Sequence, residues 1–366
     1  MKFCLNCLRP CLDKTDNFIH PCLYAILQSM IHKPSTTFRQ RIIFIVSAAY
    51  SSLVVLWLCL RWLFFDQLWP LAIINTTIFY FFLPLPILIL ITIYQRQKWA
   101  TAALLIPLFT FLFFWGTLFL PQISTTIKPS QKITAMSYNV LFSNKTPDAL
   151  AVSINSASPD IIGFQELRPA IINSLESNLS TTYPYHTFAM FDPRGVGLLS
   201  RYPIIEATKF SFPPRNRLAL HTIIDWNGQP VHVFVVHLSA NNFFDNPISQ
   251  LPQLAMERYG QRAMQITRLE EELSMIDEPV ILMCDCNLTD TSEAYFRLKQ
   301  MLNDSYRSAG WGFGHTLHPP DLPFRVQRID YVWHSDDFTS ESSYVGLAGG
   351  SDHHPVISTL AYNGKE

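Results

Sequence analysis

Three long apolar runs between residues 42 and 120 constrain this chain more than any other feature of its sequence. They cover residues 42–60, 68–94 and 99–120, which are 19, 27 and 22 residues long. About 20 apolar residues are needed to cross the hydrocarbon core of a bilayer. The runs contain Pro84, Pro86 and Pro107, which a bundle of membrane helices tolerates. The sequence therefore predicts three transmembrane helices in region 42–120.

The charges around these runs predict how the chain crosses the membrane. Residues 1–41 carry a net charge of +4, the loop 95–98 contains Arg96 and Lys98, and residues 121–366 carry a net charge of −7. Basic flanks stay on the cytoplasmic side. We therefore expect a basic cytoplasmic tail (1–41) in a multi-pass protein of the plasma or inner membrane, with an extracytoplasmic C-terminal domain. A re-entrant second run would instead leave that domain in the cytoplasm.

The seven cysteines of the chain form no strong motif. Four lie in the tail near His20, namely Cys4, Cys7, Cys11 and Cys22. Their spacing matches no strong zinc pattern, so metal binding and acylated or incidental thiols both remain open. Cys284 and Cys286 lie two residues apart on an apolar segment. Cysteines so placed on one strand rarely bond to each other, and we expect both to act as small core residues.

Beyond a polar linker at 121–132, the remaining chain (133–366) alternates strand-like and helix-like segments. The strand candidates are 133–140, 160–166, 195–201, 217–226, 230–239, 279–287, 328–334 and 354–362; the helix candidates are 146–158, 168–179, 254–276 and 291–302. The pair Asn227-Gly228 between two apolar strands predicts a tight hairpin. Many strands interleaved with a few helices indicate layered sheets with helices outside.

Polar side chains occur at the ends of these apolar strands. The set is Asn139, Glu166, His237, Asp285, Asn287, Asp330 and Asp352, with either His353 or His354. Each has a structural explanation by itself; Asp330, for example, has Arg328 nearby on the same strand face. Six strands that each deliver such a group are more typical of an active site. Carboxylates and amides with an imidazole indicate a hard-cation site and an acid–base pair.

Seven short motifs occur in an order that resembles a known superfamily. They are SYNVL, FQEL, GLLSRYPI, VVHL, CDCN, RIDYVW and SDHHPV, within residues 133–362. The series resembles the deoxyribonuclease-like endonuclease/exonuclease/phosphatase superfamily, including membrane-anchored bacterial members with three N-terminal spans. The resemblance implies a four-layer α/β sandwich, in which two packed β-sheets are flanked by helices and the site lies at one rim. Cys284 departs from the pattern, which usually has glycine there.

The resemblance also implies metal-dependent hydrolysis of a phosphodiester by water. It assigns Mg²⁺ or Mn²⁺ binding to Glu166, with Asn139 and Asp352, and catalytic roles to His353, Asp330, His237, Asp285 and Asn287. His353 would deprotonate water, and Asp330 would orient His353. His237 and Asn287 would bind phosphoryl oxygens. Strand alternation favours His354 instead, but the superfamily pattern S-D-H-x-P selects His353, and we follow that pattern.

Three readings of the function remain. Nuclease activity ranks first, a phospholipid or sphingomyelin-type phosphodiesterase or phosphatase second, and an inactive binding scaffold last. The net charge of −7 disfavours duplex binding, which relies on contacts between basic residues and phosphates. A local basic rim is possible from Arg194, Arg201, Arg215, Arg217, Arg325 and Arg328. For a lipid substrate, Phe243 and Phe244 are the only apolar insertion that the sequence suggests.

Overall fold

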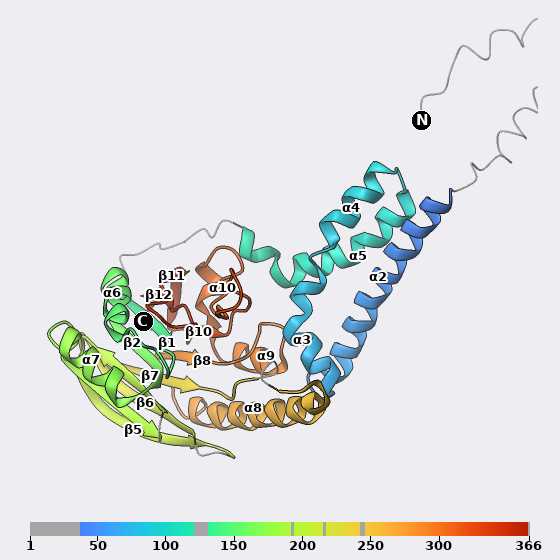
Figure 1. The fold of residues 1–366 in the computed structure, drawn as a ribbon. Coiled ribbons are helices and arrows are strands. Elements are labelled where there is room, and N and C mark those ends of the chain that lie inside the picture. The colour runs from blue at the N-terminus through green and yellow to red at the C-terminus, as the bar shows by residue number, and fades with distance from the viewer. Residues whose placement is uncertain (1–36, 121–130, 192–193, 215–216, 242–245, 365–366) are drawn as a thin grey trace, which may run out of the picture. The chain divides into compact units, whose positions relative to one another are not determined.

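The computed structural model describes residues 37–120, 131–191, 194–214, 217–241 and 246–364 (Figure 1). Most of the predicted tail with its cysteine cluster, residues 121–130 of the linker, and Phe243 and Phe244 lie outside these residues. The chain divides into two compact units. One contains the described part of Met1–Leu53 with Leu85–Ile106, and the other contains Val54–Pro84 with the described residues from Pro107 onward.

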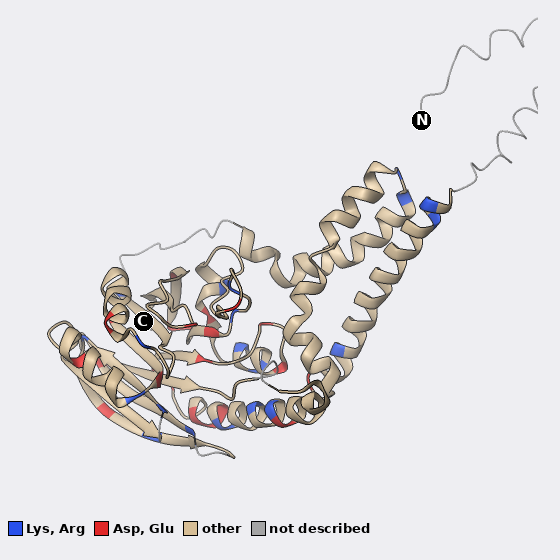
Figure 2. Ribbon diagram, in the orientation of Figure 1, with Lys and Arg blue, Asp and Glu red and all other residues tan. Residues whose placement is uncertain are grey.

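The apolar region forms helices at the predicted places. They are α2 (Phe38–Phe64), α3 (Trp69–Phe81), α4 (Leu85–Tyr94) and α5 (Lys98–Trp115), which continues as the 3-10 turn η3 (Gly116–Phe119). Two helical stretches, Phe38–Phe64 and Lys98–Phe119, are long and apolar enough to cross a membrane. Figure 2 shows how few charged residues these helices carry along their length.

The second apolar run is a bent pair of helices. α3 and α4 meet at an angle of 50°, where Pro84 and Pro86 interrupt the helical hydrogen bonding. The pair passes the same test of length and composition only if it counts as one span. The described helices therefore allow two or three crossings, and the three-span topology remains a prediction.

The C-terminal part of the chain consists of two six-stranded mixed sheets and the helices that cover them. The first sheet contains β1 (Lys132–Asn139), β2 (Ile161–Leu167), β3 (Tyr185–Phe191), β4 (Arg194–Ser200), β11 (Phe338–Val345) and β12 (Val356–Tyr362), in the order β11-β12-β1-β2-β4-β3. The second contains β5 (Ile204–Phe212), β6 (Arg217–Trp226), β7 (Gln229–His237), β8 (Val280–Asp285), β9 (Asn303–Asp304) and β10 (Asp330–His334), in the order β5-β6-β7-β8-β10-β9. Only β1–β2 and β7–β8 pair in parallel; the other neighbours are antiparallel.

Helices cover the outer faces of the two sheets and one of their shared edges. They are α6 (Pro147–Ala157), α7 (Pro169–Leu179), η4 (Ile248–Gln250), α8 (Leu251–Leu273), α9 (Glu293–Lys299) and α10 (Ser305–Ala309). One apolar core joins the facing sides of the sheets, a second joins the first sheet to α6 and α7, and a third joins the second sheet to α8 and α9. The predicted four-layer α/β sandwich is therefore confirmed.

Two local features show why these residues adopt this arrangement. Asn227 and Gly228 have φ angles of 56° and 88° and join β6 to β7 as the predicted hairpin, because a tight turn between twisted strands needs positive φ at both positions. Gly163 lies where β2 closely approaches β8 of the other sheet. A Cβ atom there would meet Met283 Cβ at 2.7 Å, so this position in β2 requires glycine. The close approach brings the ends of β1, β2 and β8 together.

Candidate active site

Asp285 is the residue around which the polar side chains gather. It ends β8, and the strand register places His237 of β7 opposite it on one side and Asp330 of β10 on the other. Asp285 Oδ2 accepts a hydrogen bond from Asn139 Nδ2 at 2.7 Å and lies 3.4 Å from His237 Nε2. Four of the predicted residues, one of them from the first sheet, therefore meet at this edge of the sandwich.

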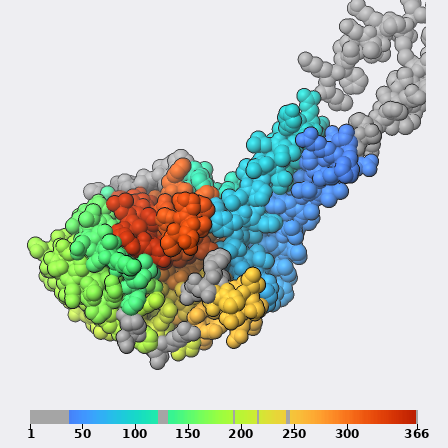
Figure 3. Space-filling model, in the orientation of Figure 1, coloured from blue at the N-terminus to red at the C-terminus, as the bar shows by residue number. Residues whose placement is uncertain are grey.

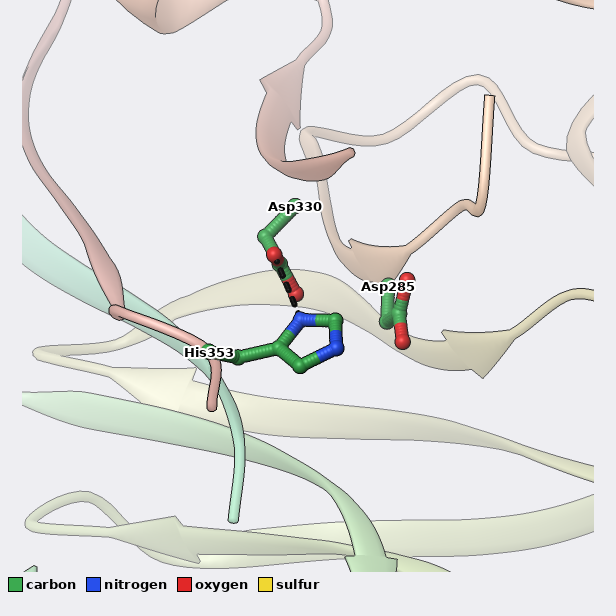
Figure 4. Close-up of side chains that lie close together, drawn as sticks. All are labelled: Asp285, Asp330 and His353. Carbon is green, nitrogen blue, oxygen red and sulfur yellow. Dashed lines mark hydrogen bonds and ion pairs between the residues drawn. The ribbon is translucent and has the colours of Figure 1, made fainter. Parts of the chain in front are cut away.

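His353 lies between two carboxylates in the loop before β12 (Figure 4). Its Nδ1 is 2.8 Å from Asp330 Oδ2, and its other ring nitrogen faces Asp285. A carboxylate can only accept a hydrogen bond when ionised, so Nδ1 carries a proton. This leaves Nε2 as the ring atom directed at the centre of the site.

The neighbouring His354 turns away from these carboxylates. Its Nδ1 lies 2.8 Å from the carbonyl oxygen of Gly346, and its ring stacks on His318 with centroids 5.9 Å apart. The turn that carries Asp352 and His353 does not keep strand alternation, because β12 begins only at Val356. The structure therefore brings the histidine of the S-D-H-x-P pattern, rather than its neighbour, to the site.

Glu166 reaches the site because β2 is irregular at its end. The pairing of β2 with β4 shifts register between Phe164 and Leu167, and Glu166 has a φ of 61°. A bulge of this kind bends a strand and redirects a side chain. Glu166 Oε2 accepts a hydrogen bond from the backbone N–H of Phe142 at 2.9 Å, while Oε1 lies 3.2 Å from the guanidinium of Arg194.

Asn287 and Asp352 complete the predicted set. Asn287 has a φ of 50°, its backbone N–H donates to Asp285 Oδ1 at 3.2 Å, and its Nδ2 donates to the carbonyl oxygen of Leu238 at 3.2 Å. Asp352 precedes His353, and its Oδ1 is buried with no hydrogen-bond donor among the described residues. All eight predicted residues therefore lie at or beside the Asp285 edge.

Burial and mutual repulsion shift the proton affinities of these groups. Burial, reinforced by the charge of Asp330, raises the pKa of Asp285 to about 7. Burial alone would lower the pKa of His353, but Asp330 and Asp285 raise it to about 10. Burial also raises the pKa of Asp352, and it lowers the pKa of His237 well below the ordinary value. The site therefore holds more negative charge than its own side chains neutralise.

This donor set fits a hard divalent cation. Asp285, Asp330 and His353 each offer one ligand atom, and these atoms lie within 4.8 Å of one another. Oδ1 of Asp330, like that of Asp352, is buried without a hydrogen-bond donor in the described part of the chain. Carboxylate oxygens suit Mg²⁺, Ca²⁺ and Mn²⁺. A bound cation would satisfy these oxygens and offset the repulsion between the carboxylates.

Two residues that sequence reasoning did not single out support the site. The hydroxyl of Ser351 donates to the carbonyl oxygen of Asn139 at 2.8 Å and accepts from the backbone N–H of His353 at 3.0 Å. The hydroxyl of Thr316 accepts a hydrogen bond from the backbone N–H of Asp330 at 3.3 Å. Ser351 belongs to the SDHHPV motif, so a signal for it was present. Thr316 lies in an irregular segment that carries no sequence signal.

The expected basic rim is only partly present among the described residues. Arg194 lies beside Glu166, and the charge of Arg217 contributes to the lowered pKa of His237. Arg215 lies outside the described residues. Two arginines, Arg194 and Arg217, therefore border the site, where a longer basic surface was expected.

Two other arginines of that expected rim lie elsewhere. Arg328 is buried, and its guanidinium is 2.6 Å from Asp304 Oδ2. It is neither a rim residue nor the partner of Asp330, because its ion pairs are with Asp304 and Asp290. Arg201 pairs with Asp160 at 3.3 Å, at the opposite end of β2 from the site. The expectation for both arginines was wrong.

The expectation that Cys284 and Cys286 stay unbonded was also wrong. The structure contains a disulfide between them, with Cα atoms 5.1 Å apart. In an extended strand, residues two apart are separated by roughly 6.6 Å. β8 ends at Asp285 and the chain turns at Asn287, so the separation falls within the usual disulfide range. The bond encloses Asp285 in a short covalent ring.

Comparison with known proteins identifies the family of the chain. The sequence profile described as "Endonuclease/Exonuclease/phosphatase family" matches residues 136–353, which is more than half of the chain. The chain belongs to this family. As a member of the endonuclease/exonuclease/phosphatase family, it is a phosphoesterase-type hydrolase. No curated protein matches the sequence significantly.

Solved structures of the family share the fold at low identity. An endonuclease/exonuclease/phosphatase from Bacteroides vulgatus has a TM-score of 0.53 and 16% identity, covering 64% of this chain and all of its own. One from Beutenbergia cavernae has a TM-score of 0.51 and 19% identity, covering 64% and 72%. Truncated TDP2 from Caenorhabditis elegans has a TM-score of 0.51 and 16% identity, covering 63% and 97%. At such identities these structures establish the fold alone.

Proposed function

We propose that this protein is a membrane-anchored phosphodiesterase that uses Mg²⁺ or Mn²⁺ and water to cleave a phosphodiester bond. Residues 133–366 form its catalytic domain, and region 42–120 crosses the membrane three times. The observation that carries the proposal is the buried pair of Asp330 and His353. Nδ1 of the histidine is hydrogen-bonded to Oδ2 of the aspartate at 2.8 Å, and Nε2 faces Asp285.

In this proposal His353 is the general base. Asp330 holds the proton on Nδ1. A bound cation that offset the carboxylate charges would lower the raised pKa of His353, and Nε2 could then accept a proton from water as that water attacks phosphorus. A carboxylate in this position also stabilises the imidazolium that forms. The triad of Asp285, Asp330 and His353 also has the spacing of a metal site. We favour the base because oxygen ligands suit Mg²⁺ and Mn²⁺ better than imidazole does.

The remaining residues bind the cation and the phosphoryl oxygens. Glu166 and Asp352 are its proposed carboxylate ligands, because Asp352 Oδ1 is buried without a hydrogen-bond donor among the described residues and the charge of Glu166 acts on both Asp285 and Asp352. Asn139 orients Asp285 through the 2.7 Å hydrogen bond. A bound divalent cation neutralises phosphate charge and polarises the P–O bond. His237, whose low pKa keeps it neutral, and Asn287 are placed to donate hydrogen bonds to phosphoryl oxygens as charge develops.

An assay with a generic phosphodiester, which does not require the natural substrate to be known, tests this proposal. The full chain, purified in detergent micelles, is mixed with bis(p-nitrophenyl) phosphate and Mg²⁺ or Mn²⁺. Release of p-nitrophenol that stops with EDTA and returns with added metal is expected. The full chain is needed because residues 54–84 pack against the catalytic domain, as the contacts of Tyr259 with Thr76 and with the carbonyl of Ala72 show. Hydrolysis that is unaffected by EDTA would contradict the proposal.

Nucleic acid remains the first substrate class by sequence, and TDP2 from Danio rerio has been solved with a single-strand DNA product. The placement of Arg201 and Arg328 weakens this ranking, because a nucleic-acid site needs several phosphate contacts along the strand.

A further inference from the structure

We propose that the exposed apolar residues Trp311, Leu322 and Phe324 form a membrane-contact surface at the rim of the active site, so that the site acts on phosphodiesters carried by membrane lipids. This inference deepens the proposed function and rests on its membrane anchoring. The three side chains are 71%, 38% and 55% exposed. They extend from segments that pack against the apolar helices α3 and η3.

Arg61 marks the far boundary of the membrane on α2. The apolar stretch of this helix begins after Arg41, and about 20 residues cross the hydrocarbon core, which ends the crossing at Arg61. The Arg61 guanidinium donates two hydrogen bonds, of 3.2 and 3.0 Å, to the carbonyl oxygen of Thr291. The catalytic domain therefore contacts α2 at the level where the chain leaves the bilayer.

The catalytic domain also reaches past that boundary, along α3. Trp57 Nε1 donates to Asn75 Oδ1 at 2.8 Å, and Asn75 Nδ2 donates to the carbonyl oxygen of Phe65 at 3.1 Å, so Asn75 lies near the Arg61 level. Tyr80 is five residues further along α3, and its hydroxyl donates to the carbonyl oxygen of Val326. At about 1.5 Å per residue, and allowing for side chains that lean back toward the helix start, Val326 lies on the order of 5 Å inside the Arg61 level.

Leu322 and Phe324 lie in the loop that leads to Val326. This loop, residues 318–325, is held at its base by a hydrogen bond from Val326 N–H to the carbonyl oxygen of Leu317 at 2.8 Å. Its depth beside α3 is that of the headgroups and the outer acyl chains. Exposed Leu and Phe side chains are stabilised there by burial in lipid, whereas in water they would be an unexplained apolar patch.

Trp311 reaches the same level by a separate route. Its ring centroid lies 5.9 Å from that of Phe119, and Gly312 N–H donates to the carbonyl oxygen of Leu118 at 2.8 Å. Phe119 ends the third apolar run, about 20 residues after its start, which again is one membrane crossing. Tryptophan is enriched at this interface, where its ring is half in lipid. Figure 3 shows this segment of the chain, in orange, at the surface of the molecule.

The surface borders the active site directly. The backbone N–H of His318, at the start of the loop, donates to the carbonyl oxygen of Asp352 at 2.7 Å, and Leu317 forms a β-bridge with His353. Arg325, which is exposed beside Phe324, can extend its guanidinium to lipid phosphates from an apolar stem. A lipid phosphodiester in the bilayer surface would therefore lie beside His353 without leaving the membrane.

Photo-crosslinking tests the surface without relying on activity. p-Benzoylphenylalanine replaces Phe324 in the full chain, reconstituted into vesicles of phosphatidylcholine with phosphatidylglycerol. The matched control carries it in place of Ile205, which is 62% exposed on β5. We expect lipid adducts from position 324 and not from position 205. No adducts at position 324, or equal yields at both positions, would overturn the membrane contact.

Hydrolysis tests the substrate class. Leu322→Ser combined with Phe324→Ser should lower hydrolysis of the vesicle phosphodiester lipids by about tenfold or more, because burial of these side chains stabilises the contact. Hydrolysis of bis(p-nitrophenyl) phosphate should stay unchanged, and Ile205→Ser should change neither. Equal losses on both substrates would contradict the inference, as would a parent chain that cleaves DNA and not lipid. A parent chain inactive on every substrate would refute the proposed function, while the adducts still report the surface.

Discussion

Replacing His353 by asparagine isolates the ring nitrogen on which the proposed mechanism depends. An asparagine amide nitrogen lies close to where His353 has Nδ1, so the variant keeps a donor for Asp330 Oδ2, which His353 contacts at 2.8 Å. It removes Nε2, the atom that faces Asp285. His353→Asn therefore removes the proposed base while it retains the hydrogen bond that orders the turn.

The expected loss follows from the role of the missing atom. A positioned general base contributes about 10²–10⁴-fold to a rate, which corresponds to about 3–5 kcal/mol of activation free energy. The fold should persist, because the side chain is 7% exposed and its contact with Asp330 is replaced rather than deleted. We expect kcat for bis(p-nitrophenyl) phosphate to fall by that factor at an unchanged melting temperature.

The adjacent histidine provides the matched control. His354→Asn keeps a donor for the Gly346 carbonyl, which His354 Nδ1 contacts at 2.8 Å, and it should alter kcat by no more than about twofold, as is usual for changes away from the chemistry. An inactive His354→Asn with an active His353→Asn would refute the assignment. A His353→Asn variant that regains full activity at high Mn²⁺ would show instead that His353 is a metal ligand.

Three further predictions follow from other residues. Glu166→Gln should raise the Mg²⁺ or Mn²⁺ concentration for half-maximal activity by on the order of 10–100-fold, whereas Asp160→Asn, at the other end of β2, should not; equal metal titrations would exclude Glu166 as a ligand. A reporter fused at the C-terminus should behave as extracytoplasmic and one near Gln97 as cytoplasmic; a cytoplasmic C-terminal reporter would exclude three crossings. Burial lowers the pKa of His221 to about 4. The unfolded chain then binds a proton that the folded chain does not, so stability should fall between about pH 6.5 and 4. His221→Phe should flatten the fall in melting temperature over that range, and an unchanged slope would contradict this cause.

The layered fold and the polar residues of the site could be read from the sequence because both depend on local periodicity. Alternation along β8 placed Asp285 at the strand end, and the Asn227-Gly228 pair identified the hairpin that joins β6 to β7. Strands of this kind are apolar on both faces because they are buried between layers. A polar side chain at the end of such a strand is therefore conspicuous without any knowledge of its neighbours.

Turns and irregular segments could not be read in the same way. The bulge that redirects Glu166, the positive φ of Asn287 and the close approach of Cys284 to Cys286 are departures from strand geometry. Periodicity describes regular structure, so it misplaced His354 and the cysteine pair. The prediction of a basic rim failed for a related reason. Composition showed that Arg328 was present, but only packing showed that it is buried against Asp304.

The sequence by itself determined the order of apolar helices, strands and polar strand ends, because hydrophobic burial and backbone hydrogen bonding act over short stretches of chain. Only the tertiary structure decided which polar atoms face one another. Asp330 and His353 are 23 residues apart, and Tyr80 and Val326 are 246 residues apart, yet each pair is in contact. Such distances depend on how two sheets, their helices and the apolar segment pack together, and that packing is a property of the whole chain.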